Sequence, residues 1–402
     1  MNLDQKKGNL WITLFLVLFA SIGPPMSLFK VGAVMDMIIT DFNITAAQGG
    51  LISSLFASMS IVLSIPIGVI VSKYGNYILG LLSMAFVIIG SLIGAFSPNL
   101  TVMLLSRLIE GIGLALICTV GPAIITEVFP ANQQGKAMGI FMCYMSLGQA
   151  FISTIAPTII NVSGSWRGIW HFTCGYSAVF LVLWFFGLRG LSRNTESTTE
   201  ESLSDTSLDS ETVSIFSVLR NRDVLMLTIC IMTFAVSIQG ILAFYPTFFT
   251  QIKGIEAGMA MRITGLHGYI GCLGAVVAGI IIDKTGLKKW FGALVMAACA
   301  VLFAIVPVFP ASLAVIIILL IGFTVNLCPP TVYAAVPNAC KSPKEIGIAM
   351  GIVNTGLNIG NFLSAIVFGA MLDAYGWNAA FLCSSVIAGI GIISMALLKR
   401  VR

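Results

Sequence analysis

Residues 68–75 read GVIVSKYG, and residues 279–286 read GIIIDKTG. The two stretches lie 211 positions apart, so that both glycines and the lysine keep the same register. Each stretch sits between long apolar runs. A duplicated loop in this setting indicates a membrane protein built from two related parallel halves, an architecture found among solute carriers.

Further landmarks repeat at nearly the same spacing. Residues 135–140 read GKAMGI and residues 347–352 read GIAMGI, a shift of 212 positions. Trp166 recurs as Trp377, a shift of 211 positions. Because these landmarks keep one spacing over most of the chain, they support the two-halves interpretation.

The composition is that of an integral membrane protein. Hydrophobic residues make up 58% of the 402 positions and charged residues only 9%, which excludes a set of soluble domains. A helix needs about 20 apolar residues to cross a bilayer, and we predict twelve such runs. They cover residues 10–33, 48–71, 77–97, 101–124, 136–160, 167–188, 224–250, 262–283, 290–309, 311–334, 346–371 and 377–398. We therefore expect an all-α membrane protein with two pseudo-symmetric six-helix bundles.

The lysines and arginines indicate how the chain is oriented. Sixteen of them fall in the termini and loops of one side, four fall on the other side, and Arg107 lies within a helix. Because cytoplasmic loops carry the excess of these residues, we expect both termini to lie in the cytoplasm. We expect the protein to reside in the cell (inner) membrane. The net charge of +5 reflects this topology and gives no reason to expect a nucleic-acid partner.

One long polar segment divides the chain. Residues 191–214 are rich in Ser, Thr and Glu and poor in apolar residues, which is typical of a flexible linker. We predict an N-terminal bundle over residues 1–190, a cytoplasmic linker over 191–223 and a C-terminal bundle over 224–402. The other loops are short, so the function is expected to lie in the helix bundles of a monomer.

The second copy of the repeated loop resembles a signature of the major facilitator superfamily. That signature is a glycine, three residues, an aspartate, a basic residue, one residue, a glycine and further basic residues, and it is matched by Gly279, Asp283, Lys284, Gly286 and Lys288. With the twelve predicted spans, the resemblance covers essentially the whole chain. It implies the two-bundle transporter fold, with glycines that let helices approach closely.

The resemblance also implies a gate at the cytoplasmic surface. There the carboxylate of Asp283 is expected to sit on the positive N-terminus of helix five from the other half, which favours the outward-open state. The first copy keeps Gly68, Lys73 and Gly75 but has Ser72 where the acid belongs. A serine can still cap a helix, but the charge is missing. Glu127 is expected to join this gate near Lys73, or else to be a solvated loop carboxylate.

Helix four carries the only charges well inside a predicted span. Residues 107–115 read RLIEGIGLA, which resembles a second motif of the superfamily, and Arg107 and Glu110 share a helix face because they are three residues apart. An arginine inside the membrane costs about 2.5–3.5 kcal/mol on insertion scales and suggests a functional site. One hypothesis is that Arg107 faces the cavity, where it attracts an anion or lowers the proton affinity of a proton-carrying Glu110. The alternative is a neutralising ion pair that locks helix four to helix one.

The resemblance implies a substrate site at the midplane between the halves. The polar residues of the spans expected there are Lys30, Gln239, Tyr245, His267, Asn326, Tyr333, Asn354 and Asn358. Asn354, Asn358 and Asn361 share one helix face, although interhelical hydrogen bonding is an alternative role for them. His267 could exchange protons or be a hydrogen-bonded core residue. Together these residues predict a small, moderately polar, slightly cationic cavity.

No cofactor, metal site or enzymatic motif is expected. The nine cysteines show no paired spacing and read as packing residues. The chain lacks a phosphate-binding glycine loop followed by Lys and Ser or Thr, so ATP is not expected to drive it. An ion gradient remains as the source of energy.

We therefore expect a secondary active transporter that takes up a small anion or organic acid together with protons by alternating access. The grounds are Arg107, Lys30 and the scarcity of acids inside the spans. Within the superfamily the chain resembles cyanate-permease-like and organic-anion carriers. Proton-antiport efflux of drugs or metabolites is the main alternative. A membrane sensor that does not transport is a further alternative, which would require a signalling segment that the linker does not offer.

Overall fold

The computed structural model of the protein describes residues 3–63, 66–189, 218–342 and 345–401. Within these ranges the side chains of residues 3–9, 66–73, 131–132, 134–136, 283 and 347 are not described. The described chain is helical and contains no strand. The predicted linker, residues 191–223, lies mostly outside the described residues.

The described residues of the N-terminal half form eight helical segments. They are α1 (Leu3–Ala33), α2 (Met35–Phe42), α3 (Ala46–Leu63), α4 (Pro66–Ala95), α5 (Leu100–Val128), α6 (Ala131–Met142), α7 (Tyr144–Ser163) and α8 (Arg167–Gly187). The segments of the C-terminal half are α11 (Arg222–Gln251), α12 (Ala257–Thr285), α13 (Lys288–Ile305), the 3₁₀ turn η1 (Ala311–Leu313), α14 (Ala314–Val325), α15 (Cys328–Ala339) and α16 (Ile346–Ala396).

The helices account for the predicted membrane spans. The described residues contain 11 helical runs that are long and apolar enough to cross a bilayer. The longest run, Ile348–Ala396, has 49 residues and is interrupted at Gly376, where φ is 80°. It therefore crosses twice, which gives the twelve spans that the sequence predicts.

The backbone repeats its turns at the spacing of the sequence repeat. Six described residues have positive φ, a conformation that glycine adopts without strain. They form three pairs at spacings of 211, 211 and 212 residues, which are Asn43 with Gly254, Gly75 with Gly286, and Gly164 with Gly376. Gly75 and Gly286 are the closing glycines of the duplicated loop. The two halves therefore turn at equivalent positions.

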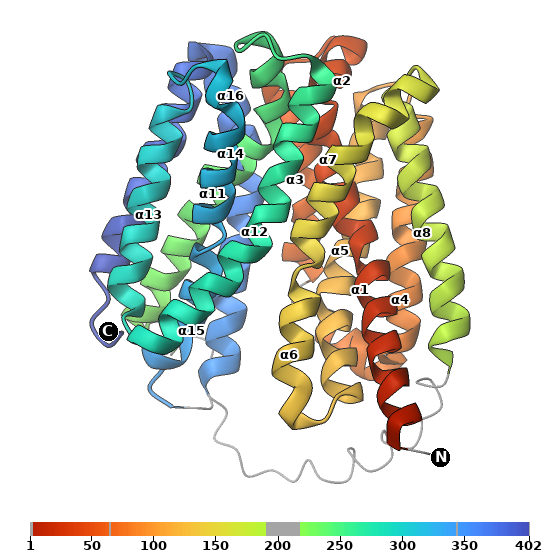
Figure 1. Ribbon diagram of the computed structural model, residues 1–402, viewed down its shortest axis with the longest axis vertical. Helices are drawn as coiled ribbons and strands as arrows, with labels where there is room; N and C mark the ends of the chain where they lie inside the picture. Colours follow the sequence, from red (N-terminus) through yellow and green to blue (C-terminus); the bar gives the residue numbers. More distant parts are fainter. Residues whose placement is uncertain (1–2, 64–65, 190–217, 343–344, 402) are drawn as a thin grey trace.

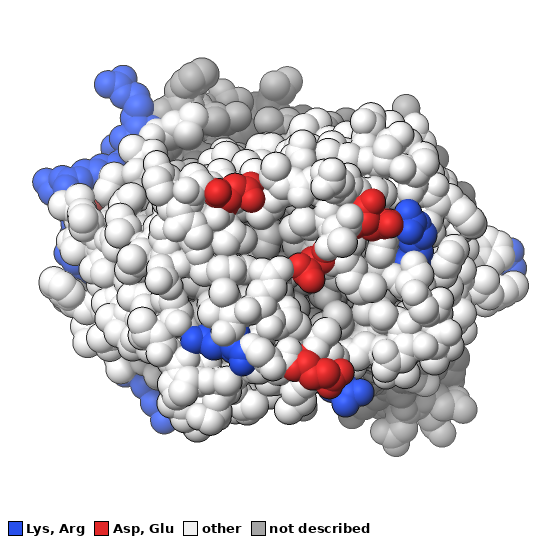
Figure 2. All heavy atoms as spheres, turned by 90° about the horizontal axis from the view of Figure 1, so that it is seen from above, with Lys and Arg blue, Asp and Glu red and all other residues white. Residues whose placement is uncertain are grey.

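The two halves stand side by side, and both chain termini lie at one end of the bundle (Figure 1). We call this the terminal end and the opposite one, near α2, the far end. The halves meet where α1 packs on α11, α3 on α16 and α7 on α12. Seen from the far end, charged side chains are few and scattered over a largely uncharged surface (Figure 2).

Glycines bring the halves into backbone contact toward the far end. A Cβ atom at Gly50 of α3 would lie 2.0 Å from the carbonyl oxygen of Ala365 in α16. One at Gly369 of α16 would lie 2.5 Å from the carbonyl oxygen of Ala46. Because a Cβ essentially never comes this close to backbone, only glycine permits these approaches.

A carboxylate closes the same end. Asp373 of α16 accepts hydrogen bonds from the backbone amides of Ala46 and Ala47, at 3.0 and 2.8 Å, at the N-terminus of α3. Nearby, Gln251 of α11 donates to Asp36 of α2 at 2.7 Å. A negative group on the free amides of a helix N-terminus is stabilising. These contacts join the two halves at the far end.

The described polar contacts at the terminal end have a different pattern. Asn76 donates to Glu127 at 3.3 Å within the N-terminal half, and Lys288 donates to Asn338 at 2.6 Å within the C-terminal half. No described heavy atom lies within 4 Å of a Cβ built at Gly139, Gly279 or Gly351. These glycines are therefore not packed against a neighbouring helix in this conformation.

Candidate functional site

A cavity of about 940 Å³ lies between the two halves. The N-terminal half contributes walls from α1, α3, α5, α6 and α7, and the C-terminal half from α11, α12, α15, α16 and Asn326 between α14 and α15. Apolar side chains such as Leu28, Phe29, Leu114 and Met145 form most of the lining. The volume lies within the range of sites that bind small molecules.

Polar groups gather on the C-terminal side of the cavity. This amide wall consists of Gln239, Asn326, Tyr333, Asn354, Asn358 and Asn361. The Tyr333 hydroxyl donates to Oδ1 of Asn354 at 3.2 Å, and Nδ2 of Asn358 donates to the backbone oxygen of Asn354 at 3.1 Å. Each primary amide carries two N–H donors, so these internal bonds leave further N–H groups available to a solute.

The opposite side of the cavity is also uncharged. Cys118, Thr119 and Tyr144 line it, and the Cys118 thiol lies 3.1 Å from the Tyr144 hydroxyl. Among the described residues no Asp, Glu, Lys or Arg belongs to the lining. The predicted slightly cationic lining is therefore wrong for this conformation. The physical reason is that the buried charges of the N-terminal half find their partners behind the wall.

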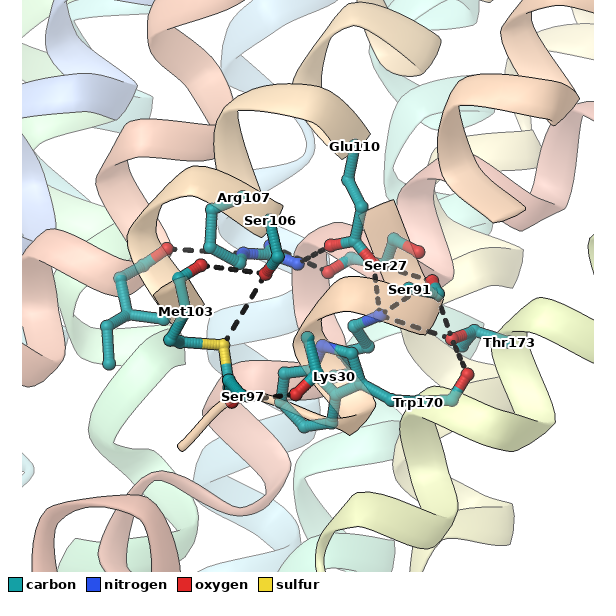
Figure 3. Close-up of polar contacts among 12 residues, drawn as sticks. Ser27, Lys30, Ser91, Ser97, Met103, Ser106, Arg107, Glu110, Trp170 and Thr173 are labelled. Carbon is teal, nitrogen blue, oxygen red and sulfur yellow. Dashed lines mark hydrogen bonds and ion pairs between the residues drawn. The ribbon is translucent and has the colours of Figure 1, made fainter. Parts of the chain in front are cut away.

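Three charged residues meet in the core of the N-terminal half (Figure 3). Nζ of Lys30 in α1 lies 2.5 Å from Oε1 of Glu110 in α5, and Arg107 is paired with Oε2 of the same carboxylate. Lys30 also donates to the hydroxyls of Ser91 and Thr173, each at 3.1 Å. Its ammonium thus has three oxygen partners and lies 4.5 Å from the centre of the Trp170 ring. We call Lys30, Arg107 and Glu110 the charge cluster.

The guanidinium of Arg107 is held by backbone as well. It donates through Nε to the carbonyl of Ile52 at 3.2 Å and through Nη2 to the carbonyl of Ser27 at 2.8 Å. The Phe56 ring lies 4.5 Å from it. In this conformation Arg107 does not face the cavity, in contrast to the first hypothesis. Its contacts are those of the alternative, an ion pair that links helix four to helix one.

The charge cluster carries one uncompensated positive charge when its groups are in their usual ionisation states. Two cations share one carboxylate, and the side chains of all three residues are fully buried. Nevertheless, residues that are close to the cluster in the sequence line the cavity. Leu28 precedes Lys30 by two residues and Leu114 follows Glu110 by four, and both line the cavity.

Two predicted site residues lie away from the cavity. Nδ1 of His267 in α12 lies 3.1 Å from Oε1 of Gln149 in α7, across the boundary between the halves. Tyr245 is buried in the aromatic core of the C-terminal half, where its ring stacks on Phe249 at 5.4 Å. Neither residue contributes to the cavity lining.

The predicted gate residues are described only in part. The side chains of Gly68, Ser72, Lys73 and Asp283 lie outside the described residues, so the interactions expected for them stay predictions. Glu127 is exposed and accepts from Asn76. Lys284 is exposed as well. Among the described residues, no heavy atom lies within 4 Å of a Cβ built at Gly279, and the helix contact expected there stays a prediction.

Sequence reasoning missed the residues that close the far end and those that support the charge cluster. Asp373 stands near the end of a span and has no acidic counterpart in the other half, since position 162 is Val162. Ser91 and Thr173 are small polar residues within apolar helices. Such residues often bond across helices in membranes, which was the available signal.

Comparisons with known proteins agree with this architecture. The sequence model of the Major Facilitator Superfamily matches residues 10–342. The chain is 23% identical to a probable sulfoacetate transporter, SauU, of Cupriavidus necator, over 91% of this chain and 88% of that protein. It is 26% identical to the riboflavin transporter RibZ of Clostridioides difficile, over 69% of each chain.

The fold is also similar to that of a solved structure. A crystal structure of a bacterial homolog to the human lysosomal transporter Spinster, in an inward-facing and occupied conformation, superposes with a TM-score of 0.79. The sequence identity is 14%, and the match covers 97% of each chain. At this identity the likeness concerns the fold alone.

Proposed function

Because the chain belongs to the Major Facilitator Superfamily, we propose that it is a secondary active transporter that takes up a small organic anion together with protons. The observation that carries the anion assignment is the uncompensated positive charge of Lys30, Arg107 and Glu110 behind a cavity whose described lining holds no acid. The movement is alternating access, in which the two halves, residues 1–190 and 224–402, rock about a central site.

The distribution of glycine contacts supports alternating access. Toward the far end Gly50 and Gly369 are packed against backbone of the other half, whereas Gly139, Gly279 and Gly351 have no described neighbour within 4 Å. Rocking halves require small residues at both ends of the bundle. When the far-end glycines separate, the glycines at the terminal end can pack in their place. Given the lysine and arginine distribution, we assign the terminal end to the cytoplasm, which makes this conformation inward-facing.

The charge cluster favours an anion without touching it. At an effective dielectric constant of about 20, a unit charge attracts an opposite charge about 10 Å away by roughly 1.7 kcal/mol. Because the cluster is buried, dissolved salt weakens this attraction only slightly. The amide wall then supplies N–H donors for carboxylate, sulfonate or hydroxyl oxygens without a direct ion pair.

Proton coupling is assigned to Glu110. In this conformation its carboxylate accepts from Lys30, Ser91 and Arg107, so protonation would leave two buried cations without an anion. Proton binding belongs to the other state, after the contacts around Glu110 loosen.

The direct test is transport by purified protein in proteoliposomes. Labelled sulfoacetate is the probe, because the relative SauU is named a probable sulfoacetate transporter and sulfoacetate is a small dianion. The proposal expects accumulation when the outside is acidic and loss of accumulation when a protonophore collapses the gradient. If acid outside gives no stimulation of any anion tested, the symport assignment is refuted.

A second candidate is proton-antiport efflux of a larger, weakly polar molecule. It is favoured by the size of the cavity, about 940 Å³, and by its largely apolar walls. Riboflavin is the matching probe, since the relative RibZ carries that substrate name. Efflux of riboflavin from preloaded vesicles, driven by acid on the receiving side, would favour this candidate over anion uptake.

A further inference from the structure

The seam between α7 and α12 joins the two halves over several turns. A Cβ atom at Gly268 of α12 would lie 2.4 Å from the carbonyl oxygen of Ser146 and 2.9 Å from the backbone nitrogen of Ala150 in α7. At the same level, the side chain of His267, which immediately precedes Gly268, bonds with that of Gln149 across the seam at 3.1 Å. The two backbones are therefore in direct contact without intervening side chains.

Two cysteines from opposite halves continue this seam toward the terminal end. Cys272 follows Gly268 by one turn of α12, and Cys143 precedes Ser146 by three residues at the junction of α6 and α7. Because the helices run antiparallel, these positions form the next contact along the seam. Each thiol donates to a carbonyl of its own helix at 3.7 Å, Cys143 to Gly139 and Cys272 to Gly268.

The cysteine pair lies beside residues that line the cavity, although neither cysteine is itself part of the lining. Both cysteines are partly exposed. Met142 and Tyr144 flank Cys143, and Ala275 follows Cys272 by three residues, and all three line the cavity. Helices that touch through a glycine one turn away allow the Cα separation of roughly 4.4–6.8 Å that a disulfide spans.

We propose that Cys143 and Cys272 form a redox modification site, at which hydrogen peroxide oxidises the two thiols to a disulfide that joins the two halves. One thiol attacks the peroxide oxygen, becomes a sulfenic acid and releases one water. The second thiol then attacks that sulfur, the S–S bond forms and a second water leaves. The two sulfurs together lose two electrons and two protons, which hydrogen peroxide takes up.

The disulfide acts on the rocking movement. This role rests on the proposed function, in which the halves move relative to one another and the contact of α7 with α12 must shift when the far end opens. A covalent bond at its terminal end holds α7 and α12 in their present register and keeps the far end closed. Oxidation therefore stops transport, and a thiol reductant restores it.

The test uses the full chain with a protease site inserted within residues 196–210, so that cleavage separates the halves. The membrane-embedded protein is treated with hydrogen peroxide, quenched, cleaved and run on a non-reducing gel. We expect the two halves to migrate together, and to separate after reduction or when either Cys143→Ser or Cys272→Ser is present. Cys383→Ser, which removes a cysteine from the C-terminal half alone, serves as the matched control and should still crosslink.

Each result decides the proposal. Halves that separate after peroxide treatment of the unmodified protein overturn the modification site, because this readout does not depend on transport. Crosslinked protein that still exchanges solute at the rate of the reduced protein overturns the locking role. If peroxide stops solute exchange by the unmodified protein but not by Cys272→Ser, the locking role is supported.

Discussion

The two polar regions of this protein differ in whether their polar groups are buried with partners or face an open cavity. In the N-terminal half, Lys30, Arg107 and Glu110 are fully buried and have partners on neighbouring helices. In the C-terminal half, the amide wall lines an open cavity, and Asn354 is exposed although it lies within the bundle. The charged region has few free hydrogen-bonding groups, and the uncharged region has many.

This difference separates two tasks that a carrier must perform. The charge cluster joins α1, α4, α5 and α8, and in the proposed function it also makes the electric potential of the cavity more positive. The amide wall offers directional hydrogen bonds that can form and break in each cycle. Substitutions in the first region should therefore affect stability and charge preference, while those in the second should affect solute binding.

The largest effect is expected from Glu110→Gln. Removal of the carboxylate leaves Lys30 and Arg107 buried without an anion, which should lower the free energy of unfolding by about 3–5 kcal/mol. Thermal unfolding of the purified protein in detergent measures this loss. The double variant Lys30→Met with Glu110→Gln removes one of the unpaired cations and should recover part of the stability. A single variant as stable as the unmodified protein would show that the cluster does not hold the half together.

Asn358→Asp should abolish anion uptake while the protein stays folded. The substitution is nearly isosteric, but it places a carboxylate in a cavity whose described lining holds no acid. At about 5 Å and an effective dielectric constant of about 20, its repulsion of an anion is on the order of 3 kcal/mol. Uptake in proteoliposomes measures the effect. Asn358→Leu, the uncharged control, should weaken uptake less, and equal effects of the two variants would argue against an anionic solute.

Lys30→Met should weaken anion binding without removing the ion pair of Glu110 and Arg107. The cluster then becomes neutral, and the cavity loses an attraction of roughly 1–2 kcal/mol, which corresponds to an increase in Kd of about 5- to 30-fold. Binding at two salt concentrations provides the readout. An unchanged Kd would mean that the buried charge has no influence on the solute.

Asp373→Asn should alter access to the cavity and leave both polar regions intact. The variant weakens the charge-assisted bonds to Ala46 and Ala47 at the N-terminus of α3. Loss of such a cap is worth about 0.5–2 kcal/mol, so the far-end-open population should rise by at most about 30-fold. Distances between spin labels on α3 and α16 at the far end would report the shift. Gln251→Ala, which removes only one neutral donor to Asp36, should move the distribution less.

The sequence predicted the fold well because its decisive features are local. Apolar runs long enough to span a bilayer and the 211-residue repeat require no knowledge of tertiary contacts, and Gly75 and Gly286 adopt the same positive φ. The common face of Asn354, Asn358 and Asn361 also follows from helical spacing alone. These three residues all line the cavity.

The orientation of Arg107 could not be predicted in the same way. Helical spacing shows that Arg107 and Glu110 share a face, but α5 is apolar on its other sides, so no pattern tells whether that face points to the cavity or into the half. The answer depends on Lys30, Ser91 and Thr173, which come from three other helices. The far-end contact of Asp373 with α3 likewise joins residues more than 300 positions apart.

The most direct test of the account is a binding measurement that compares an acid with its uncharged amide. Purified protein and Lys30→Met are titrated with sulfoacetate and with a neutral analogue in which amides replace both charged groups. The account predicts that the unmodified protein binds the acid more tightly than the amide and that Lys30→Met loses most of this preference. Equal affinity of the unmodified protein for the acid and the amide would contradict the claim that a buried charge selects anions for this cavity.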